Sequence, residues 1–344
     1  MALNIRSTGK MDLRINSVSP QIGIPGGDVV ILCEGFEGTA EEPGEVNFGG
    51  KAGNLVSYSE NRIIAKIVET GTGTGIVLRS EEGETPSYPF MIGHQIAEEL
   101  HPVCNPVIDR FGAIILTLSG SRGQKVPFSV YRVTMGLEKE PYLAEIMNPS
   151  GLTFDVHGDL YISSRHDGII YKVDENRQIR RFADNLGIVT GLAFDTDGYL
   201  YAGDRSGSIF KIDEEGTAVI FASLEPSISA YHLAFGPDKR LYVSGPTLSS
   251  QDSLYYIEPN GEVKTFFRGL GRPQGLAFDH QGYLYVGASY LGIKGVWRLD
   301  WLGQIEHFIA GPVMVGLVFD SHGNLYLADT HSLYYLPLGS KMPS

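Results

Sequence analysis

One phrase of thirteen residues recurs five times after residue 150 of this 344-residue chain. The first two copies read GLTFDVHGDLYIS and GLAFDTDGYLYAG, and their phenylalanines are Phe154 and Phe194. The phenylalanines of successive copies are separated by 40, 41, 43 and 41 residues. A period of about 40 residues indicates that each copy forms one supersecondary unit that packs against the next.

The second copy shows what one unit contains. An apolar run at residues 192–194 predicts a buried strand. Asp195 and Gly198 predict the turn that follows, because aspartate closes such turns with its carboxylate and glycine accepts a positive φ. Three further strands are expected at residues 199–202, 208–212 and 217–222. Four short antiparallel strands in about 40 residues are typical of one blade of a β-propeller.

The number of units and the closure of the array follow from the ends of the repeats. A weaker copy at residues 107–115 keeps the Asp-x-x-Gly turn, so six blades are expected. After Phe319 the chain has room for only three strands. The segment at residues 95–100 (QIAEEL) stands where an outer strand would precede the first inner strand. We expect this segment to pair with the last blade and close the ring, which would remove exposed sheet edges.

Residues 1–93 lack the repeat and predict a separate domain. Their short alternating segments are separated by glycine- and proline-containing turns, which favours a small β-sandwich. Between Ser17 and Phe90 the pattern S-x-S-P-x-x-G-x-x-G-G-x-x-V-x-I, a following F-G-G and a late G-T-G resemble the IPT/TIG family of immunoglobulin-like domains. We therefore expect an all-β chain with an immunoglobulin-like sandwich at 1–93 and a six-bladed propeller at 94–344.

The repeats themselves resemble two related propeller families. The segment LYLADT at residues 325–330 is similar to the NHL repeat, and the array as a whole resembles the SMP-30/gluconolactonase-like propellers. The resemblance to the SMP-30 family implies a divalent cation in the central channel, held by acidic and asparagine ligands. The starts of the expected inner strands offer no Asp or Glu here, and Asn105 supplies at most one neutral oxygen. We expect no metal and no cofactor.

Composition narrows the classes of partner. The chain carries 40 acidic and 27 basic residues, a net charge of −13, and no run of Lys or Arg, so a nucleic-acid partner is not expected. It has no apolar run long enough to span a membrane and no visible signal peptide, which predicts a cytoplasmic protein unless a leader has been removed. A disulfide between the two cysteines, Cys33 and Cys104, is not expected, because it would have to join two domains.

Candidate site residues lie where the inner strands begin and where the second strands end. Asp204 and Asp329 match the repeat, and their structural role would be to bind loop amides. His232 breaks the repeat by replacing its glycine. Weak catalytic candidates are His232, His331, Asp204 and Asp329. Candidate ligand-binding residues on the same face are Arg165, His166, Arg205, Tyr231, Gln274 and Tyr290.

Three functions remain open on this evidence. The first is a non-catalytic binding or scaffold protein that presents the propeller to a protein partner as an accessory subunit of a larger complex. The second is a metal-dependent lactonase or lyase of the SMP-30/NHL type, and the third is a module that binds a carbohydrate or another small ligand. Aromatic pairs such as Tyr255-Tyr256 and Phe266-Phe267 favour the first, because aromatic side chains are common in protein interfaces.

Overall fold

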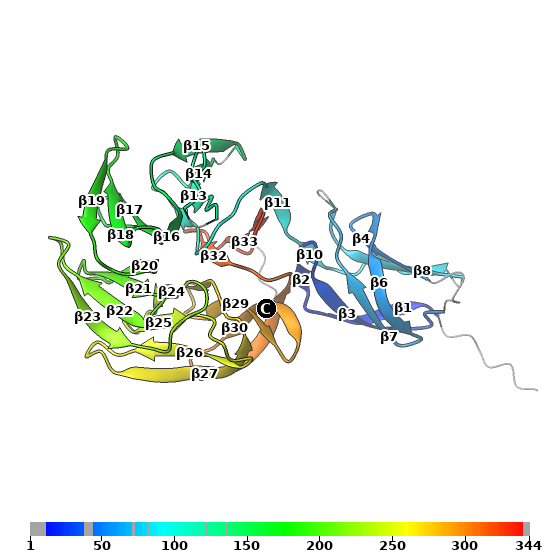
Figure 1. Cartoon of the computed structure of the whole chain (residues 1–344). Helices are drawn as coiled ribbons and strands as arrows, with labels where there is room; N and C mark the ends of the chain where they lie inside the picture. Colours follow the sequence, from blue (N-terminus) through cyan, green and yellow to red (C-terminus); the bar gives the residue numbers. More distant parts are fainter. Residues whose placement is uncertain are drawn as a thin grey trace, which may run out of the picture. The chain divides into compact units, whose positions relative to one another are not determined.

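The computed structural model describes residues 12–37, 44–70, 73–81, 83–121, 123–134 and 136–339. Within these residues all regular secondary structure is β-strand, which confirms the all-β prediction (Figure 1). The chain divides into two compact units, Met1–His94 with His307–Gly311 and Gln95–Glu306 with Pro312–Ser344.

The first unit contains two four-stranded sheets that share one apolar core. The first sheet has the order β1 (Arg14–Ser19), β3 (Asp28–Glu34), β7 (Arg62–Lys66) and β6 (Asn54–Ser59). The second has the order β5 (Lys51–Ala52), β4 (Glu45–Phe48), β8 (Ile76–Ser80) and β9 (Gly83–Glu84). Alternate residues of β3 and β7 are buried, as expected for sheets that have one solvated face. Val29, Phe48 and Leu78 are fully buried in the shared cluster.

The second unit is built from groups of four antiparallel strands. Three separate sheets run in chain order: β12 (Val107–Ile108), β13 (Ile114–Thr117), β14 (Val130–Val133) and β15 (Lys139–Leu143); β16 (Pro149–Phe154), β17 (Leu160–Ser164), β18 (Ile169–Val173) and β19 (Ile179–Ala183); β20 (Val189–Phe194), β21 (Leu200–Asp204), β22 (Ser208–Ile212) and β23 (Ala218–Ser223). The strands expected in the second copy therefore occur within three residues of their predicted positions.

The next two groups are joined into a continuous sheet. They are β24 (His232–Phe235), β25 (Leu241–Ser244), β26 (Asp252–Ile257) and β27 (Val263–Gly271), then β28 (Leu276–Phe278), β29 (Leu284–Tyr290), β30 (Ile293–Leu299) and β31 (Ile305–Ala310). The end of β27 pairs with the end of β29, with Leu270 opposite Tyr290. The last group is β32 (Gly316–Phe319), β33 (Leu325–Ala328) and β34 (Leu333–Leu336), and its fourth strand is β11 (His94–Ala97) beside β34.

The aspartate and glycine that recur in most copies of the phrase form the turn after the first strand. In the second copy, one carboxylate oxygen of Asp195 accepts hydrogen bonds from the backbone N–H of Asp197 at 3.0 Å and Tyr199 at 2.9 Å. Gly198 takes a φ of 89° in the same turn. Aspartate makes the turn locally and glycine removes its steric cost, so the turn is fixed by adjacent residues alone.

The phenylalanine and tyrosine of the phrase join successive sheets. Tyr161 of β17 packs against Phe194 of β20 with ring centroids 5.0 Å apart, and Tyr201 of β21 packs against Phe235 of β24 at 5.1 Å. The same edge-to-face contact recurs for Tyr242 with Phe278 and for Tyr285 with Phe319. Each copy therefore packs one aromatic side chain against the next copy, a geometry that adds about 1 kcal/mol beyond simple burial.

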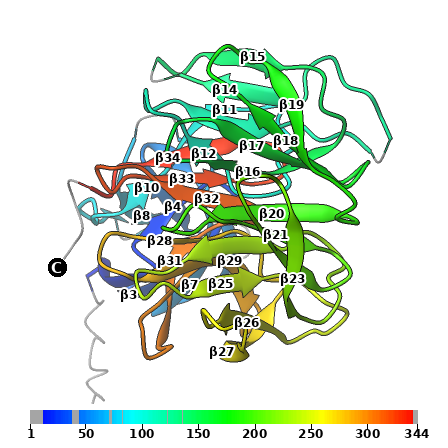
Figure 2. The same cartoon turned by 90° about the vertical axis from the view of Figure 1, so that its left-hand side faces the viewer.

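The first strands of the groups lie side by side in chain order. Contacts join β12 to β16, β16 to β20, β20 to β24, β24 to β28 and β28 to β32. A Cβ placed on Gly316, at the start of β32, would lie 2.6 Å from the carbonyl oxygen of Cys104, just before β12. Figure 1 shows β16, β20, β24 and β32 near the middle of this unit and the fourth strands β15, β19, β23 and β27 nearer its rim, and Figure 2, turned by 90°, shows β16, β20 and β32 between β15 above and β27 below. The first strands thus surround a common centre.

Candidate functional site

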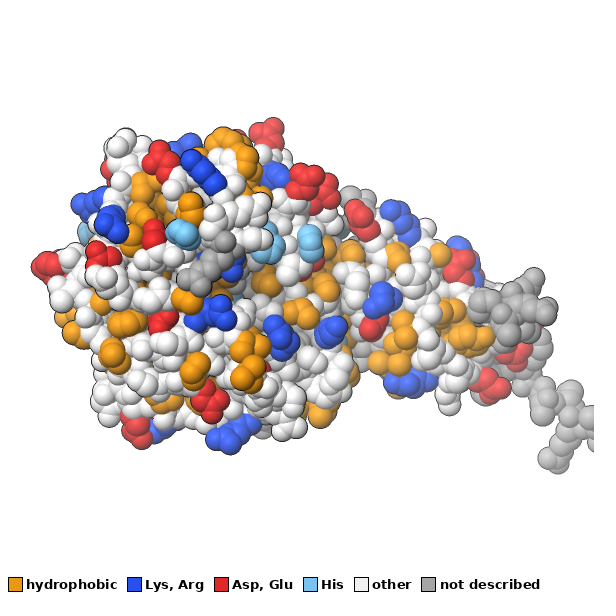
Figure 3. Space-filling view, viewed as in Figure 1, with side chains coloured by type: hydrophobic (Ala, Val, Ile, Leu, Met, Phe, Trp, Pro, Cys, Tyr) orange, Lys and Arg blue, Asp and Glu red, His pale blue; other side chains and the backbone are white. Residues whose placement is uncertain are grey.

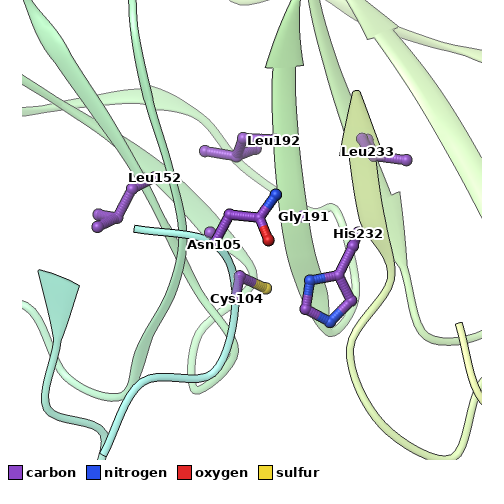
Figure 4. Close-up of a pocket in the computed structure, with 8 residues that line it drawn as sticks. Cys104, Asn105, Leu152, Gly191, Leu192, His232 and Leu233 are labelled. Atoms are coloured by element: carbon purple, nitrogen blue, oxygen red, sulfur yellow. The ribbon is translucent and has the colours of Figure 1, made fainter. Parts of the chain in front are cut away.

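A small pocket lies where four of these first strands begin. Its empty volume, including open solvent, is about 200 Å³. Two residues come from each of four segments: Cys104 and Asn105, Gly151 and Leu152, Gly191 and Leu192, and His232 and Leu233. Figure 4 shows the Cys104 sulfur, the Asn105 amide and the His232 ring gathered at the centre of this group. We call these eight residues the axial pocket.

Glycine at the strand starts allows the strands to approach one another closely. A Cβ added to Gly151 would lie 2.1 Å from the carbonyl oxygen of Thr190, and one added to Gly191 would lie 2.4 Å from that of Tyr231. Real Cβ atoms do not approach backbone this closely, so these positions accept only glycine without a backbone shift. In the third copy the same position carries His232, whose imidazole occupies space beside the axis.

His232 is an unusual histidine. Its side chain is 2% exposed, and neither ring nitrogen has a hydrogen-bond partner within the described part of the chain. Burial lowers the pKa of His232 to about 3, because a charged imidazolium would lose its hydration with no compensating carboxylate. The ring is therefore neutral at pH 7, with one nitrogen lone pair and one N–H facing the interior.

Asn105, a second polar residue of the axial pocket, connects two of the first strands. Its amide nitrogen donates to the carbonyl oxygen of Leu276 at 2.7 Å, and its amide oxygen accepts from the backbone N–H of Leu317 at 3.2 Å. The side chain thus bridges β28 and β32 and has both of its polar ends occupied. It positions strands, and one lone pair of its amide oxygen is used in doing so.

Cys104 faces the same space with a protonated thiol. It is 5% exposed, and its sulfur lies 3.7 Å from the Ser150 hydroxyl and 3.8 Å from the carbonyl oxygen of Tyr231. Burial raises the pKa of Cys104 to about 12, and the Ser150 hydroxyl and the charge of Arg165 only partly oppose that effect. The thiol is therefore no nucleophile at neutral pH. Neither Cys104 nor Cys33 forms a disulfide.

The axial pocket does not fit the hard divalent cation of the SMP-30-like propellers. Calcium and magnesium take six or more oxygen ligands, usually with carboxylates among them. No carboxylate lines this pocket, and its side-chain donors are a thiol, an imidazole and an amide with both ends occupied. No catalytic step through such an ion is derived for this chain.

The two candidate aspartates hold loops in place. Asp204, 6% exposed, accepts a hydrogen bond from the backbone N–H of Ile188 at 2.7 Å and another from the Ser206 hydroxyl. Asp329 accepts from the backbone N–H groups of His331 and Ser332, both at 2.7 Å. Each carboxylate organises the loop that follows a second strand, as their match to the repeat suggested.

Arg165 and Arg205 brace neighbouring loops. The guanidinium of Arg165 donates to the carbonyl oxygen of Gly120 at 2.9 Å and to the Ser119 hydroxyl at 3.1 Å. The guanidinium of Arg205 donates to the carbonyl oxygens of Ser227 at 3.3 Å and Ile228 at 2.6 Å. These contacts direct both cations towards the protein.

The remaining candidates are dispersed. His166 and His331 are exposed, and His331 Nδ1 lies 2.8 Å from the Thr330 hydroxyl. Tyr231 and Gln274 are buried. The Tyr231 hydroxyl donates to the backbone carbonyl oxygen of Glu225, and the backbone carbonyl oxygen of Gln274 accepts from the Ser244 hydroxyl. Tyr290 is half-buried between Phe267 and Trp297, with ring centroids 5.5 and 5.2 Å away.

Of the ten candidate residues, only His232 lines the axial pocket. Cys104 and Asn105 were not among the predicted site residues, although both stand at the start of the weaker copy that precedes the other five. The available signal was positional: His232 and Asn105 stand where other copies have glycine, so both break the pattern at the same end of a first strand.

The loop role of Asp204 leads to a first prediction. Asp204→Ala leaves the Ile188 N–H without its acceptor and should lower the free energy of unfolding by about 1–3 kcal/mol. Both tryptophans of the chain, Trp297 and Trp301, belong to the second unit, so their fluorescence during urea unfolding reports on that unit. Asp204→Asn keeps an acceptor oxygen, so it should lower the free energy of unfolding by less than Asp204→Ala does. Equal losses for the two variants would contradict the assigned hydrogen bond.

Comparisons with known proteins add evidence on the fold. No protein family model matches the chain, and no curated protein sequence matches it. Among solved structures, an auxiliary nutrient binding protein from Bacteroides ovatus matches with a TM-score of 0.55 at 11% identity, covering 95% of this chain and 98% of that one. A gluconolactonase-like protein matches with a TM-score of 0.58 at 17% identity over 71% of this chain and 91% of its own.

A third similar structure is virginiamycin B lyase from Staphylococcus aureus, with a TM-score of 0.52 at 15% identity over 83% of this chain and 94% of its own. At these identities the likeness is one of fold alone, and it supports a β-propeller. In the part of the chain that the structure describes, no helix is long and apolar enough to cross a bilayer.

Proposed function

We propose that this chain is a non-catalytic binding protein that presents its propeller to a protein partner, as an accessory subunit of a larger assembly. In this proposal an IPT/TIG-like sandwich precedes a six-bladed NHL-like propeller, whose ring is closed by β11. The pairing of β11 with β34 and the close approach of Gly316 to Cys104 support the closed ring. The observation that carries the proposed function is an exposed apolar surface on the loops of the joined sheet.

That surface consists of Leu248, Tyr290, Leu291 and Ile293, which we call the apolar platform. Leu248 is 92% exposed and Leu291 is 82% exposed, and both follow the second strand of a group. Tyr290 and Ile293 flank Leu291 in the hairpin between β29 and β30. Exposed leucines beside an aromatic ring are a composition typical of protein interfaces rather than of a solvated rim.

Buried polar contacts link the loop of Leu248 to the chain segment that pairs with the hairpin of Leu291. Asp252, 2% exposed, accepts hydrogen bonds from the backbone N–H of Thr247 at 2.9 Å and from that of Arg272 at 3.3 Å. Leu270, two residues before Arg272, pairs with Tyr290. Hydrogen bonds and strand pairing thus connect the loop of Leu248 indirectly to the hairpin of Leu291. A preformed surface loses less conformational entropy on binding than a mobile one.

Charge argues for a protein rather than a nucleic acid as the partner. The net charge is −13, and Figure 3 shows Lys and Arg side chains interspersed with Asp and Glu on the visible face. A phosphate backbone is normally bound by a continuous basic surface. Mixed charges around apolar groups suit a protein interface, whose rim is polar.

The enzymatic alternative has less support from the site. Asp204, Asp329, Arg165 and Arg205 are engaged in loop contacts, and the axial pocket does not match a hard cation. Gluconolactonase-like and lyase structures share the fold at low identity, which leaves this alternative open to the test below. A small-ligand module is the second candidate, because the similar nutrient binding protein matches along nearly its whole length.

The test compares two double variants of the full chain. Leu248→Asp with Leu291→Asp places charge on the platform, whereas Val156→Asp with Trp301→Asp alters side chains that are 88% and 81% exposed in turns at the other ends of the strands. Captured from native extract at native abundance, the unchanged chain and the Val156/Trp301 variant should retain the same protein partner. The platform variant should retain at least about tenfold less, because a few buried apolar residues dominate most interfaces.

Other outcomes would overturn the proposal. Equal retention by both variants, or no specific partner with the unchanged chain, would exclude the platform as a partner surface. One equivalent of calcium, magnesium or zinc in purified protein, together with lactone opening, would favour the enzyme. A rise in melting temperature with acidic sugars, without turnover, would favour the small-ligand module.

A further inference from the structure

The axial pocket contains two buried groups that face one another without interacting. Figure 4 shows the Cys104 sulfur directed towards the side of the pocket where the His232 ring lies. No hydrogen bond joins the thiol to either ring nitrogen. Both side chains are at least 95% buried, so bulk water does not satisfy them.

The buried His232 imidazole, without a hydrogen-bond partner in the described part of the chain, indicates that a ligand binds between it and the Cys104 thiol. Most buried polar side-chain atoms in native proteins have a hydrogen-bond partner, and each exception suggests a missing water, ion or functional role. Here the histidine replaces a glycine of the repeat, so the fold does not require an imidazole at this position. The thiol reaches the pocket from a distant part of the sequence, which makes their convergence a property of the folded chain.

We propose that the axial pocket binds one soft monovalent cation of the Cu⁺ class, with the Cys104 sulfur and one His232 ring nitrogen as its ligands. Thiolate and imidazole together are soft and borderline donors, which select Cu⁺ over calcium or magnesium. The proposal is independent of the protein partner inferred above.

Charge selects a monovalent ion over a divalent one. A thiolate carries one negative charge and a neutral imidazole none, so a monovalent cation gives a site with no net charge. Leu152, Leu192 and Leu233 form the apolar wall of the pocket, and no carboxylate lines it. A divalent ion would leave one uncompensated positive charge in these surroundings, which is costly in an apolar interior.

The surrounding contacts favour the thiol and the imidazole as the ligands. The Ser150 hydroxyl and the Tyr231 carbonyl lie 3.7 and 3.8 Å from the Cys104 sulfur, where they can fix its orientation. Asn105 is a poor competitor for the ion, because its amide oxygen is a hard donor and already accepts a hydrogen bond from the Leu317 N–H.

Binding follows a simple proton balance. The S–H bond of Cys104 breaks, its proton leaves to solvent, and the sulfur lone pair forms the bond to the ion; no electron is transferred. A cysteine thiol keeps its proton near neutral pH, and an imidazole binds a metal ion through the lone pair of its neutral form. One proton is therefore released per ion, and the apparent affinity should rise about tenfold per pH unit between pH 6 and 8.

The experiment titrates the full chain anaerobically with Cu⁺ against a coloured Cu⁺ chelator. Cys33 provides a matched control: it is 1% exposed, burial raises its pKa to about 11, and its sulfur lies 3.8 Å from the carbonyl oxygen of Glu60 in the other unit. The unchanged chain and Cys33→Ser should each bind one equivalent with the stated pH dependence. Cys104→Ser and His232→Gly should bind about a hundredfold more weakly or not at all.

Folding and binding are separated by tryptophan fluorescence, which must show the second unit folded in each variant. His232→Gly restores the residue of the other copies, so it removes a ligand without foreign bulk. Failure of the unchanged chain to take Cu⁺ from the chelator would overturn the proposal, as would loss of binding in Cys33→Ser or retention in folded Cys104→Ser. Affinity that does not change between pH 6 and 8 would exclude the thiolate as a ligand.

Discussion

Lowering the pH from 7 to 4 is expected to destabilise the unchanged chain by about 3 kcal/mol more than the His232→Gly variant. In the folded protein burial holds the His232 pKa at about 3, whereas an unfolded histidine titrates near pH 6.5. Above pH 6.5 the ring is neutral in both states and the shift has no effect on stability. Below pH 6.5 the unfolded chain takes up a proton that the folded chain does not, so stability falls by about 1.4 kcal/mol per pH unit until pH 3.

Urea unfolding followed by tryptophan fluorescence at pH 7, 5.5 and 4 measures this difference in the second unit. Other titrating groups act on both proteins alike, so the comparison isolates His232. The exposed His331 is the matched control for loss of a histidine side chain, and His331→Gly is measured beside the other two proteins. Parallel pH dependence for the unchanged chain and His232→Gly would show that the ring is accessible to solvent or paired.

Adding one methyl group at the axis should have a comparably large effect. Gly151→Ala is expected to lower the free energy of unfolding of the second unit by about 3 kcal/mol, the upper end of the usual cost of overpacking. The new Cβ would lie 2.1 Å from the carbonyl oxygen of Thr190 and 3.0 Å from the backbone nitrogen of Leu192. Both atoms belong to the neighbouring strand β20, so relief requires moving a whole strand rather than a side chain.

Gly136→Ala is the control for Gly151→Ala. The nearest atom to a Cβ at Gly136 is the Thr134 hydroxyl at 3.6 Å, an ordinary contact, and the residue is exposed. This variant should change stability by less than about 0.5 kcal/mol. If Gly151→Ala were equally mild, the first strands would be farther apart than described.

The sequence predicted those parts of the fold that depend on neighbouring residues or on the repeat. Asp195 and Gly198 predicted their turn because all of its hydrogen bonds are local. The Asp195 carboxylate accepts from N–H groups only two and four residues later in the chain, so no distant partner is needed. The strand at Ser208–Ile212 was placed at its observed bounds because alternation within one segment shows which side chains face inward. The period of 40 residues also indicated that neighbouring copies pack together, which the contact of Tyr161 with Phe194 shows.

The candidate site was predicted only in part, because loop contacts between blades cannot be read from one segment. Arg165 and Arg205 looked available for a ligand, yet their guanidinium groups bind carbonyl oxygens of loops about 20 to 45 residues away in sequence. Nothing in the local sequence indicates such partners. His232 was correctly marked as a break in the pattern, but the sequence did not show that it is buried without a partner.

The all-β class, the repeat unit and its turns could be predicted from the sequence alone, since these arise from contacts within about 40 residues. The folded chain was needed to show that Cys104 and His232 face one pocket and that Asn105 bridges Leu276 and Leu317. Those residues come from separate copies and meet because the first strands converge on one centre. The chemistry of the axis therefore depends on which side chain each copy contributes there, a property that no single copy contains.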